Sequence, residues 1–265
     1  MFHELVKVCQ AQSPKHAFRF RNRLQALDAT VVKLCIKLFL WAKYRPRKGA
    51  IKIPTRYEYS GQLPSFINIT AGKTHEIRIA RELDFEPYSI SVFDRAYIDF
   101  SWFYDIHQKP AYWLTRAKSN LSFVVVQKPE HRLPRLSPLA RRRGIRKDQV
   151  VRVVGAHADD IPIELRLVTH YDADKKETFR YLTNILHLSA WTVSQIHKAR
   201  WKIELFFKWI KQHLKIKTFL GISENAVYAQ IWIAMITFAA GLCQTFNEKF
   251  TESFRDPSVT SGKLV

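Results

Sequence analysis

One carboxylate stands among cations and a histidine in the segment 197–211, which reads HKARWKIELFFKWIK. On an α-helix, where each residue turns by about 100°, His197, Arg200, Glu204 and Lys211 fall within roughly 60° of one another. The apolar residues fall on another side and predict a face that packs against a core. The polar side could hold a metal ion through its carboxylate and phosphates through its cations. The alternative, and the commoner use of such a pattern, is a solvated ion-pair face.

Two more isolated carboxylates follow apolar segments earlier in the chain. Asp28 lies in the polar end of a short predicted strand, 24–30, and Asp94 follows the predicted strand Ser89–Phe93. If these strands are neighbours, both carboxylates project at one edge of a sheet, where Glu204 could join them. Phosphodiester chemistry without a protein nucleophile needs such a set, because two divalent metal ions about 3.5–4 Å apart activate the attacking oxygen and stabilise the leaving one. The alternative for each aspartate is a turn or capping residue.

The 265 residues carry a formal net charge of +20, and 47% of them are hydrophobic, enough for a substantial core. Such an excess of cations favours a polyanionic partner, with nucleic acid first and a membrane surface second.

The apolar run 231–243 is shorter than the roughly 20 residues that cross a bilayer, so it predicts a buried helix. Residues 1–7 lack the apolar stretch of a secretory signal. Cys9, Cys35 and Cys243 lie far apart in the sequence without metal-ligand spacing, which disfavours zinc and suits a reducing cytoplasm.

The predicted elements suit a mixed α/β sheet with a β-rich segment after residue 120. They begin with a hairpin that turns at Ser60–Gly61, and its first strand is expected to be interrupted at Pro54 because proline lacks an amide. Near the end, a helix begins at Ser189 and bends near Arg200. The hairpin strands are expected at 50–57 and 65–70, alternating helices and strands at 75–83, 89–93, 99–107 and 111–115, short strands at 123–127, 150–154, 163–169 and 179–182, and two final helices at 189–214 and 224–250.

A basic excursion interrupts the β-rich segment at 128–147, where several prolines and the run Arg141–Arg143 predict a loop. Its cations are either simply solvated or phosphate contacts, and the charge of the chain leaves both readings open.

The spacing Arg200-x3-Glu204-x6-Lys211, with a ring residue three positions before Arg200, resembles the Y-x2-R-x3-E-x6-K signature of bacterial insertion-sequence DDE transposases of the IS-four group. Asp94-Arg-Ala-Tyr97-Ile-Asp-Phe100 resembles the second-aspartate motif of that family, and Leu27-Asp28-Ala-Thr30 resembles the first. Gly49-Ala-Ile-Lys52 and Leu114-Thr-Arg-Ala-Lys118 also resemble sequence patterns of that family. The resemblance runs from about Phe18 to Phe250, with the motifs in the order of the family.

The resemblance implies an RNase H-like mixed sheet flanked by helices, with a β-rich insertion before the third catalytic carboxylate. The domains expected from it are the first part of a catalytic core at 1–118, the insertion at 119–187, core helices with the third carboxylate at 188–250, and a polar tail at 251–265. Only 27 residues precede Asp28, where family members carry a DNA-end-recognition region. A copy shortened at its N-terminus is therefore expected.

The resemblance also implies roles for the candidate site residues. Asp28, Asp94 and Glu204 would be both the catalytic residues and the ligands of two Mg²⁺ ions, with Mn²⁺ as a substitute. Arg200 and Lys211 would hold phosphates of DNA. Tyr97 would support Asp94 or touch the terminal strand, or else be a packed core aromatic. His197, in place of the signature tyrosine, would contact DNA with a pH dependence near neutrality, or else be a half-buried helix residue with no DNA role.

The expected function is that of a DNA transposase catalytic domain that performs magnesium-dependent cut-and-paste transfer. Its partners would be double-stranded DNA at transposon ends and at the target, bound by one chain or by a homodimer, without a membrane, in the cytoplasm at the nucleoid. One alternative is a metal-dependent nuclease of the same fold that does not join strands. Others are a truncated, inactive DNA-binding remnant and a basic structural or RNA-binding protein, which the lack of an aromatic RNA platform motif disfavours.

Overall fold

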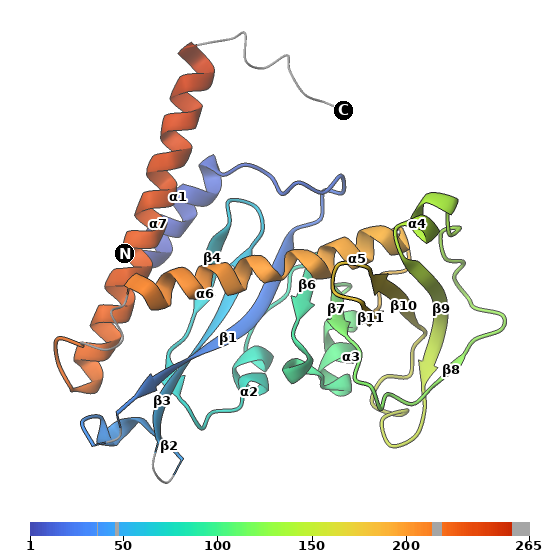
Figure 1. Ribbon diagram of the computed structural model, residues 1–265, viewed down its shortest axis with the longest axis horizontal. Helices are drawn as coiled ribbons and strands as arrows, with labels where there is room; N and C mark the ends of the chain where they lie inside the picture. Colours follow the sequence, from blue (N-terminus) through green and yellow to red (C-terminus); the bar gives the residue numbers. More distant parts are fainter. Residues whose placement is uncertain (36, 46–47, 214–218, 256–265) are drawn as a thin grey trace. The chain divides into compact units, whose positions relative to one another are not determined.

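The computed structural model describes residues 1–35, 37–45, 48–213 and 219–255, which form two compact units (Figure 1). Unit 1 contains Met1–Arg19, Thr30–Lys73 and Leu205–Val265, and unit 2 contains Phe20–Ala29 and Thr74–Glu204. The residues predicted for catalysis, Asp28, Asp94 and Glu204, all belong to unit 2. The geometry of that unit therefore decides how they are placed.

Unit 2 is built on a mixed sheet in the order β1-β6-β7-β11-β10-β9-β8. β1 is parallel to β6 and β6 to β7, whereas β7, β11, β10, β9 and β8 pair with their neighbours antiparallel. The predicted α/β class, a mixed sheet flanked by helices with several strands between Asp94 and Glu204, is confirmed. The strands are β1 (Leu24–Leu34), β6 (Ile90–Phe93), β7 (Tyr112–Arg116), β8 (Phe123–Val125), β9 (Ile145–Val153), β10 (Leu165–Asp172) and β11 (Glu177–Thr183), and the helices are α2 (Glu76–Arg81), the 3₁₀ turn η2 (Arg95–Tyr97), α3 (Phe100–Gln108), α4 (Pro138–Arg142) and α5 (Ala190–Ala199).

Two local predictions for these elements were wrong. β1 does not end in a turn at residue 30 but continues to Leu34, because the β-branched residues Thr30, Val31 and Val32 extend the strand, so Asp28 lies inside it. The basic excursion is not all loop, since it contains α4, which the hydroxyl of Ser137 caps by accepting the Ala140 amide at 3.1 Å.

Stacked aromatic rings fill the space between α3 and the parallel strands of unit 2. Phe103 of α3 lies against Trp113 of β7 with ring centroids 4.3 Å apart, and against Phe93 of β6 at 5.7 Å. All three side chains are 0% exposed. Phe93 directly precedes Asp94, so this packing fixes the strand end that carries the second carboxylate.

Unit 1 contains the predicted hairpin, in which β3 (Lys48–Glu58) pairs antiparallel with β4 (Leu63–Ile67) and β5 (Thr70–Ala71). Gly61 lies in the turn with φ +68°, a conformation that favours glycine. Pro54 does not interrupt β3, because its carbonyl still accepts the Asn68 amide at 3.0 Å. The short β2 (Lys43–Arg45) pairs with the other end of β3, after the 3₁₀ turn η1 (Leu40–Ala42).

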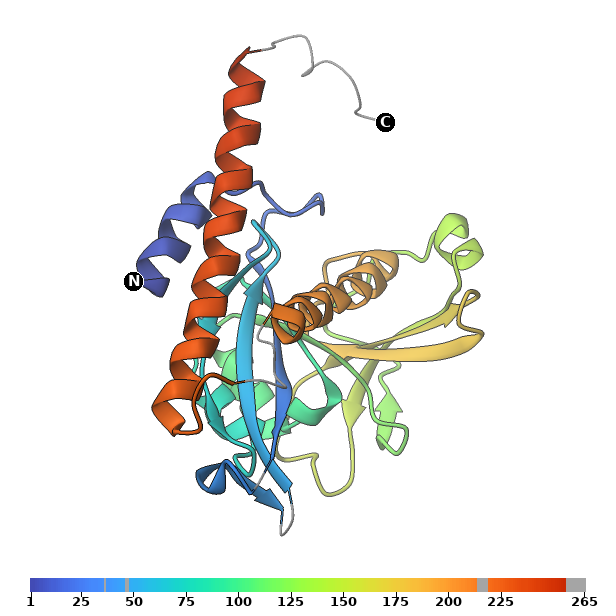
Figure 2. The ribbon, with the colours of Figure 1, turned by 60° about the vertical axis from the view of Figure 1, so that its left-hand side comes forward.

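Helices α1 (Phe2–Gln12) and α7 (Glu224–Arg255) lie side by side in unit 1 (Figures 1 and 2). The rings of Phe2 and Trp232 lie 5.4 Å apart, and Cys9 and Cys243 form a disulfide with their Cα atoms 5.1 Å apart. The sequence analysis had taken the three cysteines to suit a reducing cytoplasm and had not predicted this pair, whose members lie 234 residues apart. Only packing between distant helices brings them together.

The last predicted helix, 224–250, is confirmed as α7, which is longer than the apolar run 231–243 within it. Its stretch Glu224–Thr245 is long and apolar enough to cross a membrane, with a mean hydropathy of 1.7. Length and composition alone do not separate such a span from the core helix of a soluble protein.

Arg166 is a fully buried cation that joins three parts of unit 2. Its side chain is 0% exposed, and its Nε and Nη2 atoms donate to the carboxylate of Asp148 on β9 at 2.7 and 2.8 Å. Its Nη1 atom donates to the carbonyl oxygens of Ile185 and Leu188, which lead into α5. The two-point ion pair and these bonds satisfy a charge that would otherwise be very costly to bury.

Replacing Arg166 by Met should destabilise the protein by about 3–5 kcal/mol, because Asp148 would be left as an unpaired buried charge. Denaturant unfolding followed by circular dichroism measures this loss. The double variant Arg166→Met, Asp148→Leu is the control, since it removes both charges and should be the more stable of the two. Equal stability of the single and double variants would contradict the account.

Candidate active site

The two aspartates predicted for catalysis come from neighbouring parallel strands. In the register of β1 and β6, Leu27 lies opposite Phe93, so the next residues, Asp28 and Asp94, follow at the same level. Asp94 comes directly after β6 and begins η2, where its Oδ2 accepts the Ala96 amide at 3.4 Å. The prediction that these residues lie on adjacent strands is confirmed.

Glu204 and Arg200 come from a pair of consecutive helices, α5 and α6 (Trp201–His213). Ser189 caps the start of α5 as predicted, by accepting the Thr192 amide at 3.1 Å. The predicted bend near Arg200 is not seen: Arg200 is the C-cap of α5 and α6 begins at the next residue, but the backbone of Arg200 stays helical, with φ −53° and ψ −29°. Because Arg200 and Glu204 lie four residues apart along this helical path, the guanidinium and the carboxylate lie side by side.

The guanidinium of Arg200 lies between two of the three carboxylates. Its Nη1 donates to Oδ2 of Asp28 at 2.6 Å, and its Nη2 donates to Oε1 of Glu204 at 2.5 Å. The side chains of Arg200 and Asp28 are 16% and 17% exposed, whereas that of Glu204 is 56% exposed. One cation therefore bridges a strand and a helix that lie 172 residues apart in the sequence.

The pKa of Asp28 reflects both its burial and its charged neighbours. It is raised to about 6, mainly by burial and less by the carboxylates of Asp94 and Glu204, while Arg200 opposes the rise. Burial alone would lower the pKa of the Arg200 guanidinium, but Asp28 and Glu204 raise it overall. Three acidic groups thus share one electrostatic environment around a single cation.

The donors suit a hard divalent cation, although their present arrangement does not form a metal site. Among the residues that the structure describes, no three carboxylate, imidazole or thiol groups lie close enough together to hold a metal ion. Carboxylate oxygens are the ligands that Mg²⁺ prefers. The Arg200 guanidinium neutralises the carboxylates of Asp28 and Glu204. Its displacement would free carboxylate oxygens that could bind a divalent cation.

His197 is a half-buried residue of α5 whose ring lies 4.6 Å from that of Tyr181. Burial, with Arg200 and Arg116 nearby, lowers the pKa of its imidazole to about 3. The ring is therefore neutral from pH 6 to 8, and the predicted pH dependence near neutrality was wrong.

Tyr97 is buried in the core of unit 2 and is 1% exposed. Its ring centroid lies 6.3 Å from that of Phe93, and its hydroxyl has no hydrogen-bond partner among the described residues. Burial, with smaller contributions from acidic neighbours that include Asp28, raises its pKa far above the usual range. The side chain does not reach the surface, so a DNA contact is wrong for this structure and the alternative of a packed aromatic holds.

The remaining predicted residue, Lys211, is exposed on α6, seven residues after Glu204. Arg200 was predicted from the sequence to bind phosphate, but its ion pair with Asp28 was not predicted. No local pattern signals a contact between residues so far apart.

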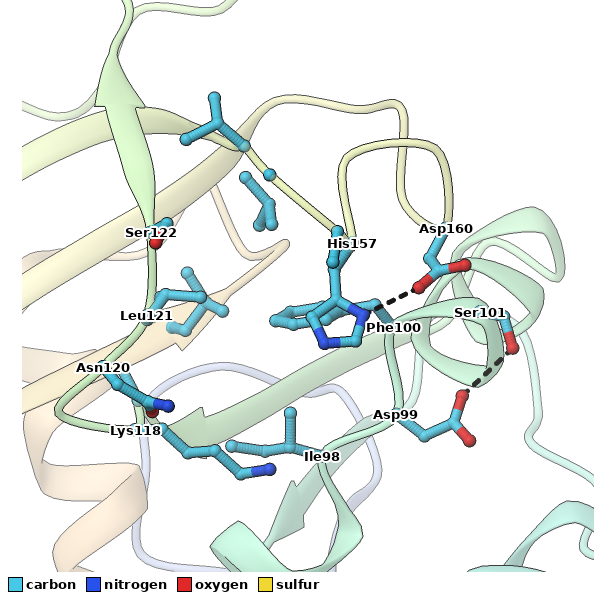
Figure 3. Close-up of a pocket in the computed structure, with 16 residues that line it drawn as sticks. Ile98, Asp99, Phe100, Ser101, Lys118, Asn120, Leu121, Ser122, His157 and Asp160 are labelled. Carbon is cyan, nitrogen blue, oxygen red and sulfur yellow. Dashed lines mark hydrogen bonds and ion pairs between the residues drawn. The ribbon is translucent and has the colours of Figure 1, made fainter.

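A separate pocket of about 490 Å³ lies beside the start of α3 and the end of β7 (Figure 3). The ring of His157 lies 5.4 Å from that of Phe100, and its Nδ1 is 2.9 Å from Oδ2 of Asp160. Ser101 donates to Asp99 at 3.0 Å on the same rim. None of the residues predicted for catalysis lines this pocket.

Residues 19–239 match the family model described as "Transposase DDE domain". The chain belongs to this transposase family. It is 34% identical over 221 residues to "Putative transposase y4zB" of Sinorhizobium fredii, which covers 83% of this chain and 60% of that protein. It is 26% identical over 234 residues to "Probable transposase for insertion sequence element IS5377" of Geobacillus stearothermophilus, covering 88% of this chain and 59% of that protein. This transposase chain thus spans about three-fifths of the length of these relatives.

A structural match is more distant. A piggyBac transposase in a synaptic complex with hairpin DNA aligns with 90% of this chain and 55% of its own, at 10% identity and a TM-score of 0.46. That score is too low to establish a shared fold.

Replacing Arg200 by Gln should make the DNA-free protein bind Mn²⁺ about tenfold more tightly or better. The guanidinium repels an incoming cation, and two unit charges 4 Å apart interact by about 4 kcal/mol at an effective dielectric constant of 20. Isothermal titration calorimetry at pH 7.5 measures the affinity. Lys198→Gln is the matched control, because Lys198 is an exposed cation of the same helix that acts on His170 and Asp172 instead. Unchanged affinity in Arg200→Gln, or an equal gain in the control, would contradict the competition.

Proposed function

We propose that this chain cleaves and joins transposon-end DNA by magnesium-dependent cut-and-paste transposition, with Asp28, Asp94 and Glu204 as the catalytic metal ligands. One observation carries the proposal. The guanidinium of Arg200 joins the carboxylate of Asp28 on β1 to that of Glu204 on α6, and Asp94 follows the adjacent parallel strand at the level of Asp28. Phosphoryl-transfer sites with two metal ions need such converging hard donors.

Each residue has a separate task in this proposal. When bound, the metal pair, Mg²⁺ or its substitute Mn²⁺, activates water or a 3′-hydroxyl and stabilises the leaving oxygen. Asp28 and Asp94 hold it from the rigid sheet, and Glu204 closes it from α6. Arg200, released from the two carboxylates, grips a DNA phosphate in two-point fashion.

Two further residues would act on the DNA rather than on the metal. Lys211 holds the backbone as a point charge without reading bases. His197 stays neutral and offers a hydrogen bond at the DNA end, in the place of the signature tyrosine.

The partners in this proposal are double-stranded DNA at the transposon ends and at the target. The formal charge of +20 favours such polyanions, and the relatives are named as transposases of insertion sequences. The chain would act alone or as a homodimer on DNA, in the cytoplasm at the nucleoid and without a membrane.

The nearest alternative is a metal-dependent nuclease of the same fold, which cuts DNA without strand transfer. The same carboxylates serve both activities, so an assay for joined products on a gel distinguishes them. An inactive DNA-binding remnant would show neither cut nor joined DNA.

Asp94→Ala and Glu204→Ala should each lower Mg²⁺-dependent cleavage of DNA carrying the ends of the element by several orders of magnitude, because the metal clamp supplies most of the barrier reduction. Binding of the same DNA without metal should be nearly unchanged. Cleavage is followed on sequencing gels and binding by fluorescence anisotropy. Asp105→Ala is the control, since it removes an exposed carboxylate of α3 in the same unit. Cleavage by Glu204→Ala at the wild-type rate would refute the assignment.

A further inference from the structure

A groove lined by cations lies in unit 2, outside the candidate active site. It has a volume of about 540 Å³ and is formed by α4, the start of β9 and the loop before α4. We call it the basic groove. Its lining residues are Leu133, Pro134, Leu136, Arg141, Arg146, Lys147, Asp148 and Gln149.

The positive charge of this region is not balanced by its own carboxylates. Residues 128–148 contain eight lysines and arginines but only two acidic residues, Glu130 and Asp148. Asp148 is held by the buried Arg166, and Glu130 lies 3.8 Å from Arg152, so both acids are paired with cations from outside the segment. Among the described residues, none of the eight cations of the segment takes part in an ion pair. Such a surface attracts a polyanion.

The groove is anchored to the sheet rather than carried on a loose loop. Gly144 joins α4 to β9 with φ +95°, and a Cβ there would lie 2.1 Å from the carbonyl oxygen of Tyr171. The Tyr171 amide donates to the Gly144 carbonyl at 2.8 Å. The guanidinium of Arg146 lies 5.3 Å from the ring of Tyr171, and that of Arg143 lies 5.0 Å from the ring of Trp191. These contacts lower the entropy cost of holding the cations in place.

One end of helix α5 lies near the basic groove, and the other end lies near the carboxylates. Its first turn carries Trp191, which contacts Arg143 at the end of α4, next to the groove-lining helix, and its last residue is followed by Arg200. Figure 1 shows α4 near the end of α5 that lies away from Arg200. Nine residues of helix span about 14 Å, which is the rise of about four base pairs of duplex. A duplex cleaved at the carboxylates would therefore reach the groove only some base pairs farther along.

We propose that the basic groove binds the sugar-phosphate backbone of double-stranded DNA at least about four base pairs from the bond cleaved at Asp28, Asp94 and Glu204. The choice of DNA as the ligand rests on the proposed function. The cations on the groove wall, two arginines and a lysine, contact phosphates and fix the register of the duplex without reading its sequence.

The test compares the wild-type chain with the triple variant Arg141→Gln, Arg146→Gln, Lys147→Gln. Binding to fluorescent duplexes of increasing length is measured by anisotropy without divalent metal, so catalysis is not needed. The control variant Arg21→Gln, Arg78→Gln, Lys109→Gln removes three exposed cations of unit 2 outside the groove. Circular dichroism checks that all three proteins are folded.

The groove variant should lose at least about tenfold in affinity for long duplexes, and its salt slope should fall by up to about three, since each lost phosphate contact lowers the slope by about 0.9. The loss of affinity should disappear on duplexes too short to extend from the carboxylates to the basic groove. The control variant should lose less affinity than the groove variant. Equal losses in both variants, a loss independent of duplex length, or tighter binding of duplex RNA than of DNA would each overturn the proposal. Because this binding test does not depend on cleavage, failure of the proposed chemistry is distinguishable: length-dependent binding would persist while the separate gel assay with Mg²⁺ shows no cut DNA.

Discussion

The contact between the Arg200 guanidinium and the carboxylates of Asp28 and Glu204 is the interaction on which the site depends. Burial is the main cause of the raised pKa of Asp28, and repulsion by the carboxylates of Asp94 and Glu204 adds to it. One cation lets the strand and the helix approach without a metal ion. In the proposed mechanism a metal ion would bind the same carboxylates, so the arginine would have to leave them before metal-dependent chemistry begins.

The rest of unit 2 serves to bring Arg200 to that position. The stacked rings of Phe93, Phe103 and Trp113 fix the parallel strands. Arg166 ties β9 and β10 to the segment that leads into α5, and Ser189 then starts that helix. The β-rich insertion thus does more than separate the second carboxylate from the third. It supports the helix that ends at Arg200 and presents the basic groove at the other end of the same helix.

Much of this arrangement could be predicted because its signals are local. The apolar run before Asp94 gives β6, the serine at 189 gives a capped helix, and the alternation around Gly61 gives the hairpin. The full length of β1 was not predicted, because an aspartate in an apolar segment usually indicates a turn at the end of a strand. The pairs Arg166–Asp148, Arg200–Asp28 and Cys9–Cys243 follow only from tertiary packing, as does the burial that keeps His197 neutral.

The central claim is that Asp28, Asp94 and Glu204 converge on one divalent metal site. Iron-mediated hydroxyl-radical cleavage of the chain tests it most directly, because Fe²⁺ bound at a Mg²⁺ site cuts the backbone beside its ligands. Mass spectrometry of the fragments should show cuts near residues 28, 94 and 204 that excess Mg²⁺ suppresses and that Glu204→Ala weakens. Cuts confined to other segments, or cuts that Mg²⁺ does not suppress, would contradict the account.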